Sequence, residues 1–323
     1  MLERIDISVV VPLYNEEESL PELCSWISRV MKEHGFTYEI ILVDDGSSDR
    51  SWGIVRQLFE TNPHIRGIRF NRNYGKSAAL NTGFHASRGA VVISMDADLQ
   101  DSPDEIPALY KMVTEEGYDL VSGWKQKRRD PLSKTIPSKF FNGVTRQISG
   151  IKLHDFICGL KAYRSEVVKN INIYGEMHRY IPVIARWRGF TAIGEKIVQH
   201  QPRKYGQTKF GWQRFITGFL DLVSITFVAK FRQKPMHFFG TLGALSFLAG
   251  IVITLWMIGW KVYNNTYLHA NVRPVTDQPL FFLALVALIV GVQLFMTGFI
   301  AEMLAMMNVR DNKYLVIEKV GLH

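Results

Sequence analysis

The chain has 323 residues, a formal net charge of +8 at neutral pH and two cysteines. Two cysteines offer no disulfide framework, and Cys24 and Cys158 fit a reduced compartment as packing residues. The positive charge alone is compatible with nucleic acid, but no helix-turn-helix, zinc-finger or RNA-binding motif accompanies it. We therefore expect no nucleic-acid partner.

Strand-like apolar runs alternate with amphipathic segments in the first two thirds of the chain. The apolar runs predict strands over residues 7–14, 38–45, 67–70, 90–96 and 118–123. The intervening segments predict helices over residues 16–34, 49–60, 76–87 and 103–116. Strands that alternate with helices indicate a mostly parallel, Rossmann-like α/β sheet with helices on both faces.

Polar clusters follow four of these strands: "NEEE", "DDGSSD", "NRNYGKS" and "DADLQD". Ligands of such sheets bind beyond the carboxyl ends of the strands, so the four clusters converge on one edge. Helix capping accounts for Asp49 and for Ser102 before Pro103. Neighbouring carboxylates repel one another unless a cation or hydrogen-bond donors compensate. Capping leaves four acids and one amide without an explanation: Asp44, Asp45, Asp96, Asp98 and Gln100.

Asp96, Asp98 and Gln100 form a cluster of oxygen ligands directly after the fourth predicted strand. Mg²⁺ and Mn²⁺ prefer oxygen ligands, and Mg²⁺ is commonly held by one or two carboxylates together with substrate phosphates. No His and Cys set with zinc spacing accompanies the cluster. These residues therefore predict a Mg²⁺ or Mn²⁺ site that offsets charge on a departing nucleoside diphosphate.

Two apolar stretches occupy the last third of the chain, and residues 236–260 and 279–301 contain no charged side chain. Each is long enough to span a bilayer, which takes roughly 20 residues. Buried core helices are the alternative, but two tandem stretches with a polar linker favour a membrane hairpin. Lys and Arg cluster before the first stretch and after the second, which predicts cytosolic termini. Residues 1–12 lack the features of a signal peptide.

These observations divide the chain into a cytosolic α/β domain, juxtamembrane amphipathic helices, two transmembrane helices and a cytosolic tail. Their expected bounds are residues 1–210, 211–235, 236–305 and 306–323. Basic residues gather in segments 125–134 and 202–215, where a cationic face is drawn to acidic headgroups or lipid phosphates. Gly240, Gly243 and Gly250 allow close helix approach and favour a homo-oligomer.

Four motifs, "VVVPLYNEEESL", "ILVDDGSSD", "NRNYGKSAALNTGF" and "MDADLQDSP", together resemble a family-2 glycosyltransferase of GT-A fold. With the two apolar stretches, the chain is similar to the polyprenyl-phosphate branch, which includes dolichol-phosphate mannosyltransferase-like and bactoprenol glucosyltransferase-like proteins. The resemblance implies an inverting, metal-dependent transfer of a hexose from a nucleotide sugar to undecaprenyl or dolichyl phosphate. It favours a UDP-sugar, with GDP-mannose as the alternative. It also implies a tetrameric, multi-pass protein of the plasma (inner) membrane, with a cytosolic catalytic domain.

The resemblance also implies roles for individual residues around the donor. Lys76 is either a donor contact or part of the helix surface. The metal would be held by Asp96, Asp98 and Gln100. The expected nucleotide-sugar contacts are Pro12, Tyr14, Glu16, Val43, Asp45, Asn73, Asp96, Ala97, Arg203 and Lys209. Arg203 and Lys209 would lie on a flap that closes over the nucleotide sugar.

On the acceptor side, the resemblance implies a phosphate site made of Lys125, Arg128, Lys134 and Ser138. Lys stands where the family often has Arg at positions 125 and 134, so bidentate contact there is lost and Arg128 would supply it. A solvated basic loop near anionic lipid is the alternative.

The resemblance implies two catalytic residues, Asp98 in the metal site and Asp155 near the reacting centre. A phosphate dianion needs little deprotonation. Asp155 is therefore expected to position the sugar or acceptor, with general base as its lesser role and His154 as a weaker candidate. Two roles are open for Glu176, His178 and Arg179: selection of the sugar, or ordinary helix packing.

Two other functions share parts of this pattern. A processive polysaccharide synthase would carry Gln-x-x-Arg-Trp, whereas this chain has only "IARW" at residues 184–187, without the glutamine, and fewer spans than a polymer channel needs. A non-catalytic membrane scaffold would have lost its ligands, yet Asp45, Asp96, Asp98 and Gln100 are present. Both alternatives fit less well than transfer to a lipid phosphate.

Overall fold

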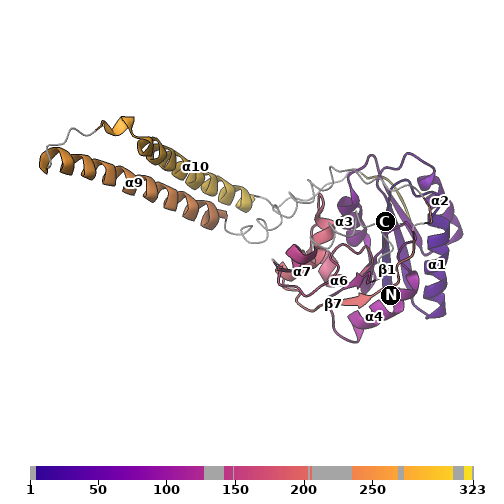
Figure 1. Ribbon diagram of the computed structural model, residues 1–323. Coiled ribbons are helices and arrows are strands. Elements are labelled where there is room, and N and C mark those ends of the chain that lie inside the picture. The colour runs from indigo at the N-terminus through magenta and orange to yellow at the C-terminus, as the bar shows by residue number, and fades with distance from the viewer. Residues whose placement is uncertain are drawn as a thin grey trace. The chain divides into compact units, whose positions relative to one another are not determined.

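The computed structural model describes residues 5–126, 142–147, 149–202, 204–205, 235–267, 273–307 and 316–321. The chain forms two compact units (Figure 1). One comprises Met1–Leu222 together with Asn312–His323, and the other comprises Val223–Asp311. The first unit carries the sheet and the second carries two long helices.

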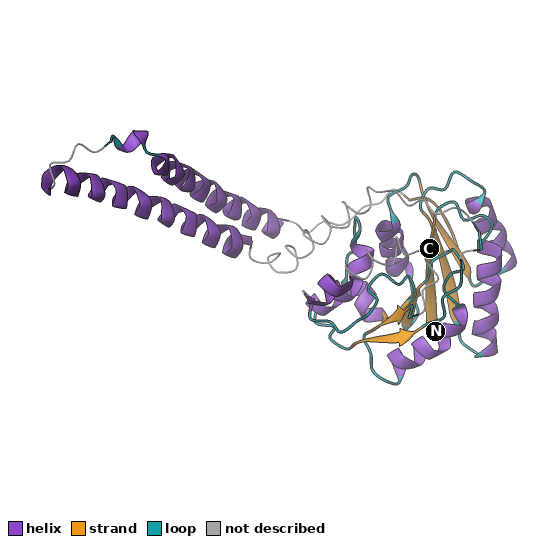
Figure 2. Cartoon of the chain, in the orientation of Figure 1, coloured by secondary structure: helices purple, strands orange, loops and turns teal. Residues whose placement is uncertain are grey.

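The strands of the first unit, orange in Figure 2, form one sheet. Four parallel strands form its centre, in the spatial order β4-β1-β2-β3. They are β1 (Ile7–Leu13), β2 (Tyr38–Asp44), β3 (Ile65–Phe70) and β4 (Val91–Ser94). Every side chain of β2 and β4 is buried. Strands buried on both faces are continuous apolar runs in the sequence, and for this reason these four were predicted within a few residues.

The sheet continues on both sides to eight strands, in the order β7-β5-β6-β4-β1-β2-β3-β8. β5 (Leu120–Trp124) and β7 (Ile193–Ile197) are parallel to each other, and β6 (Lys161–Arg164) lies antiparallel between β4 and β5. The predicted α/β class with a mostly parallel sheet is confirmed. Three of these strands, β6, β7 and β8 (Val316–Val320), were not predicted.

Helices cover both faces of the sheet, as predicted. One face is covered by α1 (Leu20–Glu33), α2 (Ser51–Thr61) and α4 (Ile106–Thr114), which follows the turn η1 (Pro103–Glu105) (Figure 1). The other face carries α3 (Lys76–Ala86), α6 (Ser165–Asn170), η2 (Met177–Tyr180) and α7 (Ile181–Trp187). The helices begin after the polar clusters, so those clusters lie at the carboxyl edge of the sheet.

The C-terminal strand β8 pairs antiparallel with β3. Trp52 Nε1 of α2 donates a hydrogen bond of 2.9 Å to Glu318 Oε2, and Arg56 Nε lies 3.7 Å from Glu318 Oε1. The segment Val316–Val320, which the sequence analysis placed in the C-terminal tail, is therefore a strand of the sheet. It is the last strand of the sheet among the described residues, and its short length and two charges are typical of an edge strand.

Replacing Glu318 with Ala should lower the stability of the first unit by about 1 kcal/mol, because Trp52 loses its partly buried hydrogen-bond acceptor. The melting temperature of the purified protein, followed by circular dichroism, should fall by about 2–4 °C. Lys319→Ala is the matched control, since this neighbouring side chain is exposed. Equal melting temperatures of the two variants would show that Glu318 does not fasten the strand.

The second unit is a hairpin of α9 (Pro235–Tyr267) and α10 (Pro279–Met307), with the short η3 (Val275–Asp277) between them. Both helices are long and apolar enough to cross a membrane. A Cβ atom on Gly243 would lie 2.7 Å from the Gly291 carbonyl oxygen, and one on Gly250 would lie 3.0 Å from the Ala284 oxygen. The close helix approach predicted from these glycines therefore occurs within one chain, and it gives no support to an oligomer.

The predicted juxtamembrane helices lie outside the described residues, apart from Pro235, which begins α9.

Candidate active site

The loops after β1 and β2 are joined by hydrogen bonds between their backbones and side chains. Asn15, at a positive φ of 56°, accepts a bond of 2.9 Å from Ser48 N through Oδ1, and its own N–H donates to Ser47 Oγ at 2.9 Å. Glu16 N donates to Ser51 Oγ at 2.9 Å. The loop that carries Tyr14 and Glu16 is thus fixed to the sheet edge, and Pro12 lies just before it, within β1. Tyr14 is 40% exposed there, as a contact for a ligand requires.

The last residue of β2, Asp44, and the next residue, Asp45, accept hydrogen bonds from backbone N–H groups of the protein. Asp45 accepts hydrogen bonds from Tyr74 N at 2.7 Å and Gly75 N at 2.9 Å, and it thereby holds the start of α3. Asp44 accepts a bond of 2.9 Å from Ser47 N. Burial raises the pKa of both carboxyl groups. These donors account for Asp44 and Asp45, two of the four carboxylates that capping left unexplained. Contact of Asp45 with the base or ribose stays a prediction.

Two other predicted donor contacts differ in how accessible they are. Val43 is fully buried in β2, whereas Asn73 is exposed in the loop before α3. Asn73 can therefore reach a bound nucleotide, but Val43 can do so only through its backbone.

Lys76, the first residue of α3, forms an ion pair with Asp96 at the end of β4. The Nζ to Oδ1 distance is 2.5 Å, and each side chain is about one-third exposed, at 32% and 31%. Burial raises the pKa of the Asp96 carboxyl, but the charge of Lys76, helped by Lys125 and His178, outweighs burial and lowers it to about 2. Lys76 is therefore not free helix surface, because its ammonium pairs with Asp96. We call Asp96, Asp98 and Gln100 the carboxylate cluster.

The loop that contains residues 155–160 approaches Asp96 from the other side. A Cβ atom on Gly159 would lie 2.4 Å from Asp96 Oδ2, so only glycine leaves room for this carboxylate. Asp155, which is buried, accepts hydrogen bonds through Oδ1 from Ile157 N at 3.0 Å and Cys158 N at 3.2 Å. Asp155 thus shapes the loop that places Gly159, and its contact with the sugar or acceptor stays a prediction.

Lys161, at the start of β6, is a buried cation that the sequence analysis did not include. Its Nζ donates to the Cys158 carbonyl oxygen, which holds the same loop, and burial lowers the pKa of its ammonium. No pattern in the sequence predicts this role, because a lysine inside a strand normally indicates an exposed edge position.

Lys125 follows β5 and was predicted to bind the acceptor phosphate. Its ammonium lies 2.7 Å from Asp101 Oδ1, and the two side chains are 13% and 0% exposed. Burial acts against the charged form, but Asp101 outweighs it and raises the pKa of Lys125. Because Asp101 already pairs with this cation, acceptor contact by Lys125 requires the pair to open. The other predicted acceptor and flap residues lie outside the described residues: Arg128, Lys134, Ser138, Arg203 and Lys209.

His178 in η2 lies at the start of α3, where its Nδ1 is 3.1 Å from Ser77 Oγ. Burial, together with the charges of Lys76 and Arg179, lowers the pKa of this imidazole well below its usual value. Glu176 and Arg179 form an ion pair of 3.0 Å with each other. These contacts explain the three residues as packing around α3, and a role in sugar selection stays a prediction.

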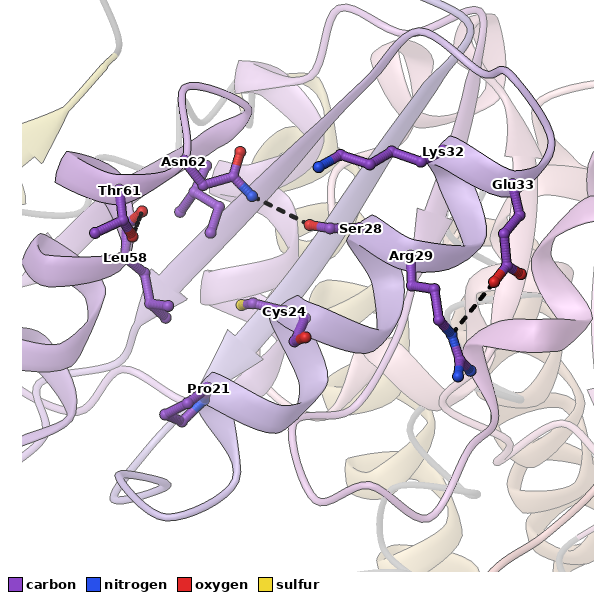
Figure 3. A pocket seen from close by; sticks show the side chains of 11 residues that line it. Pro21, Cys24, Ser28, Arg29, Lys32, Glu33, Leu58, Thr61 and Asn62 are labelled. Carbon is purple, nitrogen blue, oxygen red and sulfur yellow. Dashed lines mark hydrogen bonds and ion pairs between the residues drawn. The ribbon is translucent and has the colours of Figure 1, made fainter.

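A shallow groove of about 480 Å³ lies between α1 and α2 (Figure 3). Asn62 Nδ2 donates to Ser28 Oγ at 3.1 Å in it, and Arg29 pairs with Glu33 at 3.8 Å. None of the predicted site residues lines this groove. It is therefore separate from the carboxylate cluster.

Residues 8–171, which carry the four polar loops and the carboxylate cluster, match the sequence profile described as glycosyl transferase family 2. The chain belongs to this family. It is 34% identical over 314 residues to the dodecaprenyl-phosphate galacturonate synthase of Rhizobium johnstonii, covering 96% of this chain and 91% of that protein. It is also 34% identical over 318 residues to the undecaprenyl-phosphate 4-deoxy-4-formamido-L-arabinose transferase of Pseudomonas paraeruginosa, covering 97% and 90%.

Solved glycosyltransferase structures share the fold of the first unit. Glucosyl-3-phosphoglycerate synthase from Mycobacterium tuberculosis in complex with UDP aligns with a TM-score of 0.55 at 21% identity, over 69% of this chain and 80% of that one. The same enzyme with Mn²⁺, UDP-glucose and phosphoglyceric acid aligns with a TM-score of 0.51 at 21% identity, over 68% and 80%. The predicted family and GT-A fold are confirmed.

The carboxylate cluster of this glycosyltransferase contains carboxylate and amide oxygens, the type of ligand that a hard cation takes. Asp96 is kept ionised by its cationic neighbours, and Asp98 Oδ1 accepts a hydrogen bond of 3.2 Å from Gln100 N across the tight turn at Leu99, which has a φ of 58°. Among the described residues, no group of three or more His, Cys, Asp or Glu side chains could hold an ion. Two carboxylates and an amide suit Mg²⁺ or Mn²⁺ that completes its shell with substrate phosphates.

Proposed function

We propose that this glycosyltransferase transfers a hexose from a nucleotide sugar, with a UDP-sugar favoured, to polyprenyl phosphate at the cytosolic face of the plasma (inner) membrane. The observation that carries the proposal is the carboxylate cluster at the carboxyl edge of the sheet. The same chain contains two helices that are long and apolar enough to cross a membrane. Relatives aligned over nearly the whole chain are named for sugar transfer to undecaprenyl or dodecaprenyl phosphate, which supports the acceptor class.

The chemistry is a displacement at the anomeric carbon, in which a phosphate oxygen of the acceptor attacks opposite the departing nucleoside diphosphate. Asp96, Asp98 and Gln100 would hold Mg²⁺ or Mn²⁺, which when bound neutralises charge on the leaving diphosphate. Lys76 brings a second positive charge to the same place, and it would bind a donor phosphate oxygen when its pair with Asp96 opens. The phosphate nucleophile needs positioning more than deprotonation, so the acceptor side requires cations and hydrogen-bond donors.

Membranes that contain the protein test this proposal directly. They are incubated with undecaprenyl phosphate and a panel of radiolabelled donors: UDP-glucose, UDP-galactose, UDP-galacturonate, UDP-4-deoxy-4-formamido-L-arabinose and GDP-mannose. We expect one of the hexose donors to give a labelled lipid whose formation depends on added undecaprenyl phosphate. Transfer from the arabinose donor alone would contradict transfer of a hexose. Label that instead enters a long water-soluble polymer would favour a processive synthase, and no transfer from any donor would favour a scaffold.

Neutralising Arg128 and Lys134 together, as Arg128→Gln and Lys134→Gln, should raise the apparent KM for polyprenyl phosphate by about tenfold or more, because two charge-assisted contacts to its phosphate are lost. The donor KM should change little. Steady-state kinetics with each substrate varied in turn separate the two effects. Lys111→Gln is the matched control, since this exposed side chain lies on α4. An equal rise in both KM values would mean that the basic loop acts only through its general charge.

The proposed orientation places the loop between α9 and α10 across the membrane from the active site. An Asn-Gly-Thr sequon inserted with a lengthened linker after Tyr267 should be glycosylated in eukaryotic microsomes, whereas the same sequon added at the C-terminus should not. The native Asn264 sequon is unsuited to this test, because Asn264 lies in α9 and its amide donates to the Trp260 carbonyl oxygen at 2.7 Å. The reverse pattern would separate the active site from cytosolic nucleotide sugars.

We also propose a homo-oligomer, a tetramer by family resemblance. Light scattering of the purified protein in mild detergent measures this assembly, and a monomer at all concentrations would contradict it.

A further inference from the structure

A histidine at the carboxyl edge of the sheet is held in a fixed orientation by two neighbours. The ring of His154 stacks on Trp124, with 4.2 Å between the ring centroids and 14° between the planes. Glu195 of β7 accepts a hydrogen bond of 2.7 Å from His154 N through Oε2, and its Oε1 bonds His154 Nδ1. We call these three residues the His154 cluster.

The hydrogen bond to Glu195 decides which ring nitrogen faces outward. A carboxylate accepts the proton of Nδ1, so Nε2 is the nitrogen left for an external partner. The His154 side chain is 49% exposed, whereas Glu195 is only 18% exposed. Exposed ion pairs add little to folding stability, so stability alone does not account for a surface imidazole fixed by both a stack and a carboxylate. This arrangement is typical of a side chain that is oriented for binding.

The position of the cluster points to the acceptor side of the site. Trp124 is the last residue of β5, and the chain continues from it into the basic segment that was predicted to bind the acceptor phosphate. His154 directly precedes Asp155, and the loop that follows ends at Gly159, against the carboxylate of Asp96. His154 therefore lies one residue before the loop that reaches Asp96, and its ring stacks on the residue from which the chain enters the predicted acceptor segment.

We propose that His154 Nε2 binds an oxygen of the acceptor's phosphate monoester, with Glu195 and Trp124 as positioning residues. This inference rests on the proposed function. A phosphate monoester suits the nitrogen in either protonation state, because Nε2 accepts a hydrogen bond from P–OH when neutral and donates one to P–O⁻ when protonated. With its ring plane fixed, the imidazole orients one oxygen and leaves the others to the cations and to the attack on the sugar.

Acceptor binding by full-length protein tests the inference without a known donor. Undecaprenyl phosphate is titrated into the protein in dodecyl maltoside micelles, and the heat of binding gives the Kd. We expect His154→Gln to raise the Kd by about tenfold, as the loss of one hydrogen bond to a charged group predicts. Glu195→Gln should raise it less. In wild type labelled with ¹⁵N-histidine, one Nε2 resonance, absent from His154→Gln, should shift on addition of undecaprenyl phosphate, which a purely structural role would not cause.

His64→Gln is the matched control. His64 also stacks on an aromatic ring, that of Tyr38, at 4.2 Å, and its Nδ1 lies 3.1 Å from the Tyr38 carbonyl oxygen. It precedes β3, at the amino edge of the sheet, so this variant should leave the Kd unchanged. Inorganic phosphate and phosphatidylglycerol serve as comparison ligands, and neither should distinguish wild type from His154→Gln as undecaprenyl phosphate does.

The outcomes separate the inference from the proposed function. Wild type that fails to bind undecaprenyl phosphate would overturn both. Wild type that binds it as tightly as His154→Gln does would overturn only the role of His154. An equal loss of phosphatidylglycerol binding in His154→Gln would also overturn that role, because the cluster would then be a general site for anionic lipid.

Discussion

Replacing Asp98 with Asn should lower the turnover of sugar transfer by at least about 100-fold, because a lost metal ligand removes several kcal/mol of stabilisation from the departing diphosphate. The fold should remain intact. Asp98 follows β4 in a tight turn, and the amide oxygen of Asn can still accept the hydrogen bond that Gln100 N makes at 3.2 Å. Turnover is measured as labelled lipid formed per minute at saturating donor and acceptor, and circular dichroism checks the fold.

Asp104→Asn is the control for the loss of a negative charge near the carboxyl edge of the sheet. Asp104 lies in η1, where it accepts a hydrogen bond of 2.9 Å from Trp26 Nε1 and is more than half exposed, at 57%. Its replacement should leave turnover unchanged. Excess EDTA should reduce wild-type activity to the level of Asp98→Asn, and added Mg²⁺ or Mn²⁺ should restore it. Full wild-type activity in EDTA, or normal turnover of the Asp98 variant, would contradict the metal role.

The sequence predicted the central strands well and the outer ones poorly. The runs that became β1 to β5 are apolar because parallel strands are covered on both faces. β6 has only four residues, "KAYR", and β7 and β8 read "IGEKI" and "VIEKV". Short strands with charged side chains lack the periodicity that identifies a strand, so their pairing is decided by the neighbouring strands.

Some residues of the candidate site were predicted from the sequence, and others were not. The acids and amides at the strand ends were predicted, because the sheet topology brings these loops together. Their partners were not. Lys76 meets Asp96 across 20 residues of sequence, and Lys125 pairs with Asp101 across the β5 region. Such pairs depend on tertiary packing, and a single sequence contains no pattern that reveals them. Asp45 shows the opposite case, because a carboxylate expected to bind a ligand also holds the loop before α3.

Gly159→Ala should lower turnover by about 10- to 100-fold, through displacement of Asp96. The new Cβ would lie 2.4 Å from Asp96 Oδ2 and 2.5 Å from its Cγ, so the carboxylate has to move. The ion pair of 2.5 Å with Lys76 holds the other oxygen, so the movement breaks or strains that contact. Overpacking of this kind costs about 1–3 kcal/mol of stability. The Mg²⁺ or Mn²⁺ concentration that gives half-maximal activity should rise as well.

The control for this variant is Gly53→Ala in α2. A Cβ atom there would meet nothing within 4 Å, so this change should leave activity unchanged and stabilise the helix by about 0.5–1 kcal/mol. The double variant Gly159→Ala with Lys76→Met tests whether both residues act through Asp96. If they do, the loss of activity in the double variant will be smaller than the product of the two single losses, because the second change acts on a carboxylate that is already displaced. Independent, multiplying losses would show that Gly159 and Lys76 affect transfer by separate routes, and full activity of Gly159→Ala alone would remove Asp96 positioning as the role of this glycine.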